Sequence, residues 1–509
     1  MNKKGFTLME IIAVIALLGA IMLLVVPNIT KNFKESKKRL FYDNVVSLYT
    51  SAGRSFLLLD NTSNKTFSNS GNTLDVDVSE DITYKIVVNS YGEVTSMYVT
   101  NGTYSYSKSN SSGINKKDIK LDDIIEGTDN EDASAKVTLF DKLLVDNPTI
   151  KTRTDFNTTF TETNTGTLYK ATESIASSPA KDVYYFAGNA KNNWVKFGKY
   201  QTDKVVYRGY YSATSSSYKE YLTMDACSTA TSYNINCTEY IYWNKDNDIY
   251  WRIIRTNADG SVRLLYSGNS FDTTGGYIGE SAFNSINKDS MYVGYMYGTS
   301  GSLDNNRTNE NNSTIKTYVD NWYSNNLTSY SKYISTEAVY CNDREVGSGT
   351  YSANGSQFNY ASSTRVATNK TPTYNCTNIK DAFSGSNIEA KLTYPIGLMT
   401  ADEVAYAGGK AYTNLTSPYA WYYLNSTGGS ITGGTGSAWW SLSPFEWYKS
   451  EYGTFGWTVN YYPGRLAHAE DDSSYGVRPA ISLKTCTLWK SGDGSPENPY
   501  EIEETESGC

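Results

Sequence analysis

The sequence contains few of the residues on which metal and acid–base chemistry usually depend. Among its 509 residues there is a single histidine, His468. Multi-histidine metal centres are therefore excluded, and any histidine-dependent catalytic triad would have to use this one imidazole. Because His468 is followed by Glu470, Asp471 and Asp472, we expect it to lie in a solvated loop.

Basic residues and closely spaced cysteines are also scarce. The 45 Lys and Arg residues are outnumbered by 53 Asp and Glu residues, so the net charge is −8 and a nucleic-acid partner is not expected. No two cysteines are separated by only two residues, which argues against zinc ribbons and thioredoxin-like redox centres. The 45 tyrosines and 39 glycines are instead typical of a strand-rich surface protein.

The amino-terminal segment predicts a membrane-spanning helix. Residues Phe6–Val26 are apolar except at Thr7, Glu10 and Gly19, and as a helix they would span about 30 Å. A secretory signal peptide is the alternative, because Lys3 and Lys4 precede the run. The run is longer than a usual signal core, and it carries a carboxylate at a depth where an unpaired charge costs several kcal/mol.

The segment Lys3–Glu10 followed by the apolar run closely resembles the amino terminus of type IV prepilins and pseudopilins. The resemblance implies that a prepilin peptidase cleaves between Gly5 and Phe6 and methylates the new amino-terminal Phe6. Glu10 then becomes the fifth residue of the mature chain, where the family carries glutamate. Pro27 becomes position 22, where the family often carries a proline.

The resemblance also implies a role for Glu10 in filament assembly. A carboxylate buried in a filament core needs a cation, and cleavage creates one, the amine of Phe6 on a neighbouring subunit. An incidental polar residue in a single-pass anchor is the alternative. Pro27 either bends the helix or ends it, because proline lacks a backbone donor.

The pattern after Pro27 predicts that the helix continues as an amphipathic segment on a small sheet. Apolar residues recur every three or four positions, so one helix is expected from Phe6 to about Leu59. Alternating residues then predict an antiparallel sheet. The expected strands are 74–78, 82–88, 94–100 and 103–107.

The second half of the chain is densely aromatic, and its pattern predicts short strands with few helices. Residues 250–255 and 262–266 flank an Asn-Ala-Asp-Gly turn and predict a hairpin. Helices are expected at 313–323 and 400–406, the second with a capping box formed by Thr400 and Glu403.

The segments Tyr394–Thr400, Ala438–Pro444 and Gly476–Leu483 resemble domains of the formylglycine-generating-enzyme or C-type-lectin-like fold. The resemblance implies an irregular domain with long loops, whose relatives commonly bind sugars or proteins. Oxidase relatives use reactive cysteines and copper, for which this sequence offers no counterpart. We therefore expect no enzyme activity and no cofactor.

The cysteines and several aromatic residues are the candidate structural and binding groups of this domain. The six cysteines favour disulfides in sequence-local pairs, although their connectivity stays open. Three aromatic side chains with polar neighbours are candidates for stacking on a ligand: Trp447, Trp457 and Tyr462. The cysteine pairs are Cys227 with Cys237, Cys341 with Cys376, and Cys486 with Cys509.

Together these patterns predict an α+β protein with a pilin-like amino-terminal part and a large, strand-rich, C-type-lectin-like carboxyl-terminal domain. We expect a minor or tip subunit of a type IV pilus-like filament, inserted in the cytoplasmic membrane as a precursor and then exposed outside the cell. Its expected partners are the prepilin peptidase, the membrane, other pilin subunits, and a glycan or protein receptor. The alternatives are a pseudopilin of a secretion or DNA-uptake machine and a membrane-anchored enzyme. The expected segments are a leader 1–5, an assembly helix 6–59, a pilin-like head 60–107, a connecting segment 108–181 and a carboxyl-terminal domain 182–509.

Overall fold

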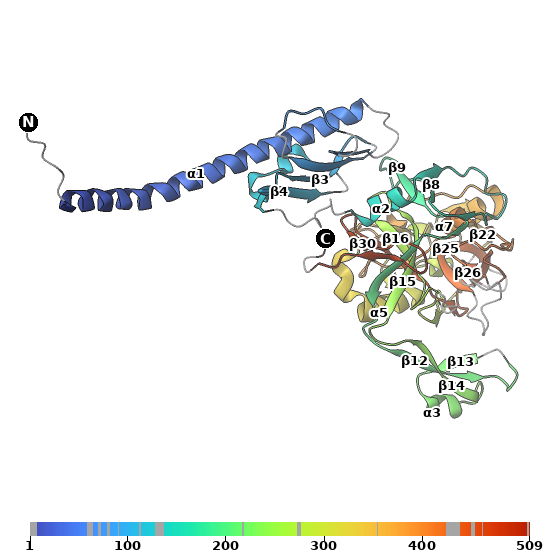
Figure 1. Ribbon diagram of the computed structural model, residues 1–509. Helices are drawn as coiled ribbons and strands as arrows, with labels where there is room; N and C mark the ends of the chain where they lie inside the picture. Colours follow the sequence, from blue (N-terminus) through green and yellow to red (C-terminus); the bar gives the residue numbers. More distant parts are fainter. Residues whose placement is uncertain are drawn as a thin grey trace, which may run out of the picture. The chain divides into compact units, whose positions relative to one another are not determined.

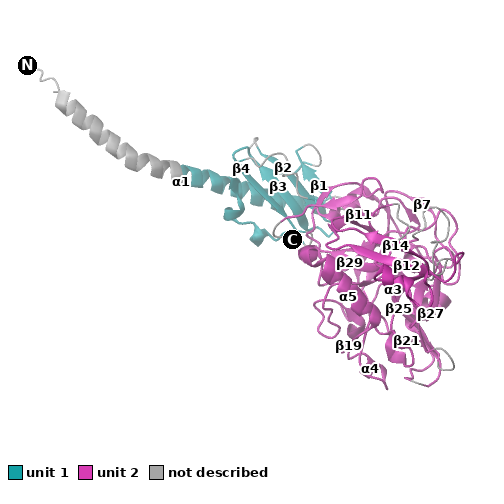
Figure 2. Cartoon of the chain, turned by 90° about the horizontal axis from the view of Figure 1, so that it is seen from below, with its two compact units in different colours: residues 1–137 teal, residues 138–509 magenta. Residues whose placement is uncertain are grey.

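The computed structural model divides the chain into two compact units, residues 1–137 and residues 138–509 (Figure 2). The structure describes residues 8–58, 65–69, 73–78, 82–89, 91–110, 113–127, 137–215, 218–271, 276–353, 355–423, 438–448, 453–460, 462–505 and 508, with side chains from residue 33 onward.

Unit 1 is built on one long helix, α1 (Leu8–Leu57) (Figure 1). The helix continues through Pro27, so the alternative in which this proline ends the helix is wrong. The carboxyl-terminal part of α1 buries one stripe of side chains against a sheet, as its periodicity predicted. The stripe consists of Phe41, Val45, Leu48, Ala52 and Phe56, each no more than 1% exposed.

The sheet of unit 1 has five antiparallel strands in sequence order, and the short 3-10 turns η1 (Lys116–Asp118) and η2 (Leu121–Asp123) lie between the fourth and the fifth strand along the chain. The predicted strands at 82–88, 94–100 and 103–107 are confirmed within two residues, but the one at 74–78 is not a strand. Residues 65–68 take the place beside β2 instead, and Leu74 is buried without joining the sheet. The strands are β1 (Lys65–Ser68), β2 (Thr83–Val88), β3 (Val94–Thr100), β4 (Tyr104–Ser109) and β5 (Ile125–Glu126).

Several residues of the predicted amino-terminal motif lie outside the described residues. Gly5 and Phe6 are not among the described residues, and the side chain of Glu10 is not described either. No helix within the described residues is both long enough and apolar enough to span a bilayer. The membrane-spanning segment and the processing site therefore stay predictions.

Unit 2 is dominated by a ten-stranded mixed sheet with seven strands on its main path. The predicted hairpin is confirmed, because β15 and β16 pair antiparallel across a turn that ends at Gly260, where φ is +82°. The main path runs β24 (Gly397–Leu398), β29 (Pro479–Leu483), β16 (Val262–Tyr266), β15 (Asp248–Thr256), β11 (Trp194–Lys199), β31 (Tyr500–Ile502) and β30 (Trp489–Ser491). Three further strands branch from it: β9 (Lys181–Tyr185) pairs with β15, β8 (Thr167–Glu173) pairs with β9, and β6 (Thr149–Lys151) pairs with β8.

A seven-stranded sheet and a three-stranded sheet complete the main framework of unit 2. The seven strands are β17 (Glu280–Ser281), β28 (Tyr475–Gly476), β25 (Trp439–Tyr448), β22 (Phe358–Tyr360), β21 (Val346–Ser348), β26 (Gly453–Val459) and β27 (Leu466–Glu470). The three strands are β13 (Tyr218–Tyr221), β12 (Lys204–Tyr210) and β14 (Ile235–Trp243). The short pairs are β7 (Thr163–Asn164) with β10 (Asn189–Ala190), β18 (Met296–Tyr297) with β19 (Asn311–Asn312), and β20 (Tyr340–Cys341) with β23 (Ala382–Phe383).

Helices occupy little of unit 2, as the sequence predicted. The two expected helices are present, and Ser313 caps α5 by accepting a hydrogen bond from the backbone of Lys316. The helices are α2 (Leu139–Asp146), α3 (Met224–Ser228), α4 (Leu303–Asn306), α5 (Thr314–Asn326), α6 (Ala361–Ser363) and α7 (Ala401–Ala407), together with the 3-10 helices η3 (Ser290–Val293), η4 (Thr328–Tyr333) and η6 (Ile379–Asp381) and the π-helix η5 (Thr364–Asn369).

The expected connecting segment 108–181 is not a linker in this structure. Residues 113–127 add η1, η2 and β5 to unit 1, whereas residues 138–181 belong to unit 2. The reason is long-range pairing, since β8 lies between β6 and β9 in the large sheet. Sequence composition identified the polar loops but not the strands between them.

Two of the three cysteine pairs are disulfides, Cys227–Cys237 and Cys341–Cys376. Both join residues that are near in sequence, as expected. Cys509 lies outside the described residues, so its pairing with Cys486 stays a prediction.

Leu48→Ala should destabilise unit 1, because Leu48 is fully buried between α1 and the sheet. We expect the free energy of opening of β2 and β3 amides, measured by hydrogen exchange, to fall by about 2–5 kcal/mol. Leu40→Ala is the control, because Leu40 is 63% exposed on the same helix. Equal losses in both variants would contradict this account of the core.

Candidate functional site

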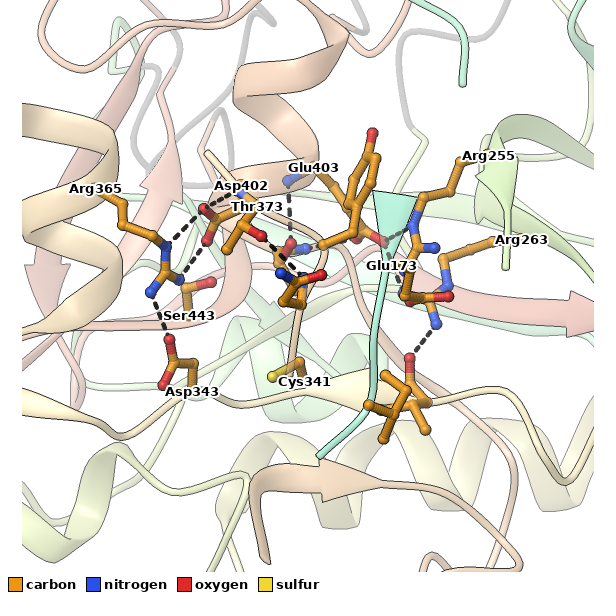
Figure 3. A pocket seen from close by; sticks show the side chains of 15 residues that line it. Glu173, Arg255, Arg263, Cys341, Asp343, Arg365, Thr373, Asp402, Glu403 and Ser443 are labelled. Atoms are coloured by element: carbon orange, nitrogen blue, oxygen red, sulfur yellow. Dashed lines mark hydrogen bonds and ion pairs between the residues drawn. The ribbon is translucent and has the colours of Figure 1, made fainter. Parts of the chain in front are cut away.

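The predicted capping box at the start of α7 carries the central residue of a buried charged pocket (Figure 3). The Thr400 hydroxyl accepts a hydrogen bond from the Glu403 backbone N–H at 3.1 Å. In return the Glu403 carboxylate accepts one from the Thr400 backbone N–H at 2.9 Å. This reciprocal pairing fixes the first turn of α7 and directs the Glu403 side chain into the protein interior.

Glu403 links α7 to two adjacent strands of the large sheet. Its Oε1 atom accepts hydrogen bonds from Arg255 Nε at 2.8 Å and from Arg263 Nη1 at 2.7 Å. Arg255 also donates through Nη2 to Glu173 Oε1 on β8, at 2.8 Å. All four charged side chains are at most 4% exposed. Buried charges need such mutual compensation because the interior solvates them poorly.

A second chain of ion pairs begins at the neighbouring residue, Asp402. Its Oδ2 atom accepts from Arg365 Nη2 at 2.9 Å, and Arg365 Nη1 donates to Asp343 Oδ2 at 2.7 Å. The Thr373 backbone N–H donates to Asp402 Oδ1 at 3.0 Å. Two consecutive residues of α7 thus bind two separate groups of charged side chains.

The pocket between these groups has a volume of about 20 Å³, room for roughly one water molecule. Burial alone would raise the pKa of Glu403, but Arg263 and Arg255 outweigh it and lower the pKa. Burial alone would lower the pKa of Arg255, but Glu173 and Glu403 raise it. Both groups therefore keep their charges at neutral pH, which suits a structural ion-pair network rather than proton transfer.

The structure does not bring the predicted ligand-binding aromatics together at the surface. Trp447 and Trp457 are 2% and 0% exposed, so the interpretation that they stack on a ligand is wrong. Trp447 packs with Phe358 in a small core, and Trp457 packs edge-to-face on Phe445 at 4.8 Å. Tyr462 is 43% exposed, with the Arg465 guanidinium 4.4 Å from its ring.

His468 lies in strand β27, not in a loop as expected. Its ring stacks parallel to Phe445 with the centroids 4.3 Å apart, and its Nδ1 lies 2.9 Å from the Tyr412 hydroxyl. These neighbours partly remove the imidazole from water, and this burial lowers its pKa. The Leu-Ala-His-Ala-Glu alternation was the available sequence signal for this strand, but the acidic neighbours obscured it.

Asp471 is a buried carboxyl group that sequence reasoning did not single out. Its side chain is 0% exposed, and the groups that face it are the Thr454 side chain and the Gly456 backbone, neither of which is a cation. Burial raises its pKa to about 8. The proton is therefore retained at neutral pH, and no cation is required for charge compensation.

Within the described residues, no three His, Cys, Asp or Glu side chains gather where they could hold a metal ion. The charged side chains around Glu403 form a buried, ion-paired interior in unit 2.

Glu403→Gln should strongly destabilise unit 2, because it leaves Arg255 and Arg263 without their shared anion. We expect a loss of about 3–5 kcal/mol in the free energy of unfolding, measured by denaturant titration of the unit 2 transition. Glu310→Gln, at an exposed position, should change it by less than about 0.5 kcal/mol. A small loss in Glu403→Gln would show that the ion pairs are dispensable.

Asp471 should make stability depend on pH. Its folded-state pKa of about 8 lies above the unfolded value near 4, so the folded chain holds a proton that the unfolded chain has released. Stability should therefore fall as the pH rises from about 4 to about 8. Asp471→Asn should remove this slope in thermal unfolding, whereas the exposed neighbour variant Asp472→Asn should keep it. A slope unchanged in Asp471→Asn would refute the assignment.

Comparison of the chain with protein-family models, with curated proteins and with solved structures finds no match in any of the three.

Proposed function

We propose that this chain is a minor or tip subunit of a type IV pilin-like filament, and that it presents unit 2 outside the cell for binding. The processing motif around Gly5 and Phe6 supports the proposal through its resemblance to prepilins. A helix on an antiparallel sheet, in the order found in unit 1, fits the same family resemblance.

The observation that carries the proposal is the length of α1 relative to its sheet. The helix has 50 residues, or about 75 Å. Its buried stripe, Phe41 to Phe56, covers only about 24 Å of this length. About 50 Å of helix precedes the stripe, far more than the head needs for its own folding.

The described helix residues before the stripe also expose apolar side chains. Phe33 is 62% exposed and Leu40 is 63% exposed, on a helix where other apolar side chains are fully buried. Packing of α1 against α1 of neighbouring subunits would remove these side chains from water. Glu10 would then pair with the Phe6 amine of a neighbour and set the register between subunits.

In this proposal the subunit is first inserted in the cytoplasmic membrane as a single-pass precursor and is then processed by prepilin peptidase. It is not an enzyme. Its bulk supports a minor or tip position, because 372 residues of unit 2 on every subunit would be hard to pack around a filament. Unit 2 would serve as the binding part, held rigid by its ion pairs and disulfides.

Glu10→Ala should block assembly without removing the protein. We expect at least a tenfold loss of the chain from the sheared-filament fraction, with its amount in the membrane fraction unchanged, both measured by immunoblot. Glu35→Ala is the matched control, because it removes an exposed carboxylate from the same helix. Normal incorporation of Glu10→Ala would contradict the assembly role.

A further inference from the structure

Residues 204–243 form an arm that projects from the rest of unit 2 (Figure 1). The arm consists of β12, β13, α3 and β14, and its three strands form a sheet of their own. In the described part of the chain, β13 and β14 each pair only with β12. The arm is therefore an appendage to the core and not one of its layers.

The arm carries an unusual share of the exposed apolar side chains of unit 2. Among the described residues of unit 2, thirteen large apolar side chains are prominently exposed, and five of them lie between residues 204 and 243. A partner that covered these side chains would remove them from water, which favours association. The five are Tyr211 (66% exposed), Leu222 (85%), Met224 (45%), Ile235 (39%) and Ile241 (47%).

The tip of the arm is almost without charge. Residues 209–236 contain one basic residue, Lys219, and two acidic residues, Glu220 and Asp225. Most of the others are Tyr, Ser, Thr, Ala and Asn. Tyrosine provides large contact area at low entropy cost, and serine and asparagine provide adaptable hydrogen bonds, as in antibody binding loops.

The arm is also held rigid at its tip. The Cys227–Cys237 disulfide joins α3 to β14 across the end of the sheet. Gly209 leaves the space for this crossing, because a Cβ there would lie 2.5 Å from Cys227 Sγ and 2.0 Å from the Tyr233 carbonyl oxygen. A rigid surface loses less entropy on binding than a flexible one.

Partly buried polar contacts join the arm to the body. Lys204 Nζ donates to the Tyr318 hydroxyl on α5 at 3.1 Å, and the Tyr218 hydroxyl donates to Glu280 on β17 at 3.4 Å. Within the arm, Arg208 Nη2 pairs with Glu220 at 2.9 Å, and its guanidinium lies 3.3 Å from the centroid of the Tyr240 ring. The arm is thus a preorganised projection.

We infer that the tip of this arm is a docking surface for another protein, one that offers a weakly charged, partly apolar surface. The aliphatic side chains Leu222, Met224 and Ile235 favour a protein over a glycan, because sugars bind mainly through aromatic stacking and hydrogen bonds. The scarcity of Lys and Arg disfavours an anionic membrane surface. The inference rests on the proposed function only in placing the arm outside the cell.

A photo-reactive amino acid in place of Tyr211, in the full chain in cells that produce it, tests the contact. We expect irradiation to join the chain to one discrete protein, identified by mass spectrometry. The same amino acid in place of Ile388, which is 85% exposed on the body of unit 2, should not give this product. Products are read in the membrane and filament fractions alike, so a chain that never enters filaments can still confirm the docking surface.

The identified protein is then purified and its dissociation constant for the full chain measured. Leu222→Asn should weaken binding at least tenfold, whereas the equally exposed control Ile388→Asn should change it less than twofold. Because the tip is nearly uncharged, raising NaCl from about 50 to about 500 mM should change the constant less than about threefold. Two crosslinking results would overturn the inference: no discrete product, or the same product from both positions. It would also be overturned if both variants had an equal effect on binding, or if Leu222→Asn lost binding to liposomes or to a glycan array.

Discussion

The carboxylate of Glu403 is the contact on which unit 2 depends most. One side chain satisfies the first turn of α7 and neutralises two arginines on adjacent strands of the large sheet. Arg255 extends the connection to Glu173, so a third strand joins the same group. Such a network is costly to desolvate and tolerates no missing member, which makes the arrangement of these elements highly specific. The result is a rigid body from which long loops and an arm project.

Unit 1 depends on a different constraint, the mismatch between a long helix and a small sheet. The buried stripe runs only from Phe41 to Phe56, and contacts with the strands reach back to Lys34, whereas the helix begins at Leu8. The sheet does not need a helix of this length in order to fold. Further contacts would remove exposed apolar side chains such as that of Leu40 from water. In the proposed filament, the helices of neighbouring subunits provide these contacts. Unit 1 would then serve assembly, and unit 2 would serve binding.

Local signals allowed much of the fold to be predicted. The capping box at Thr400 and the turn ending at Gly260 are short patterns whose geometry is set by adjacent residues, and both appear as expected. Burial of Trp457 and the raised pKa of Asp471 depend on residues distant in sequence, so composition did not reveal them. The strand containing His468 was missed because three nearby acidic residues resembled a loop.

The arm shows the same limit for a candidate site. Its tyrosines and serines resemble ordinary turns in the sequence, and only the fold shows that β12, β13 and β14 form a separate sheet and that Leu222 and Tyr211 are exposed. The charged pocket illustrates the reverse case, since the capping box was visible but its role in holding Arg255 and Arg263 was not. Side chains that meet across strands remain the part of a site least accessible to sequence reasoning.

Mass spectrometry of the mature amino terminus, on chain recovered from the sheared-filament fraction, tests the central claim most directly. The account predicts a chain that begins at Phe6 and carries one added methyl group on its amino nitrogen. A chain that begins at Met1, or one cleaved beyond Val26, would contradict it, because neither could provide the Phe6 amine that Glu10 is proposed to bind.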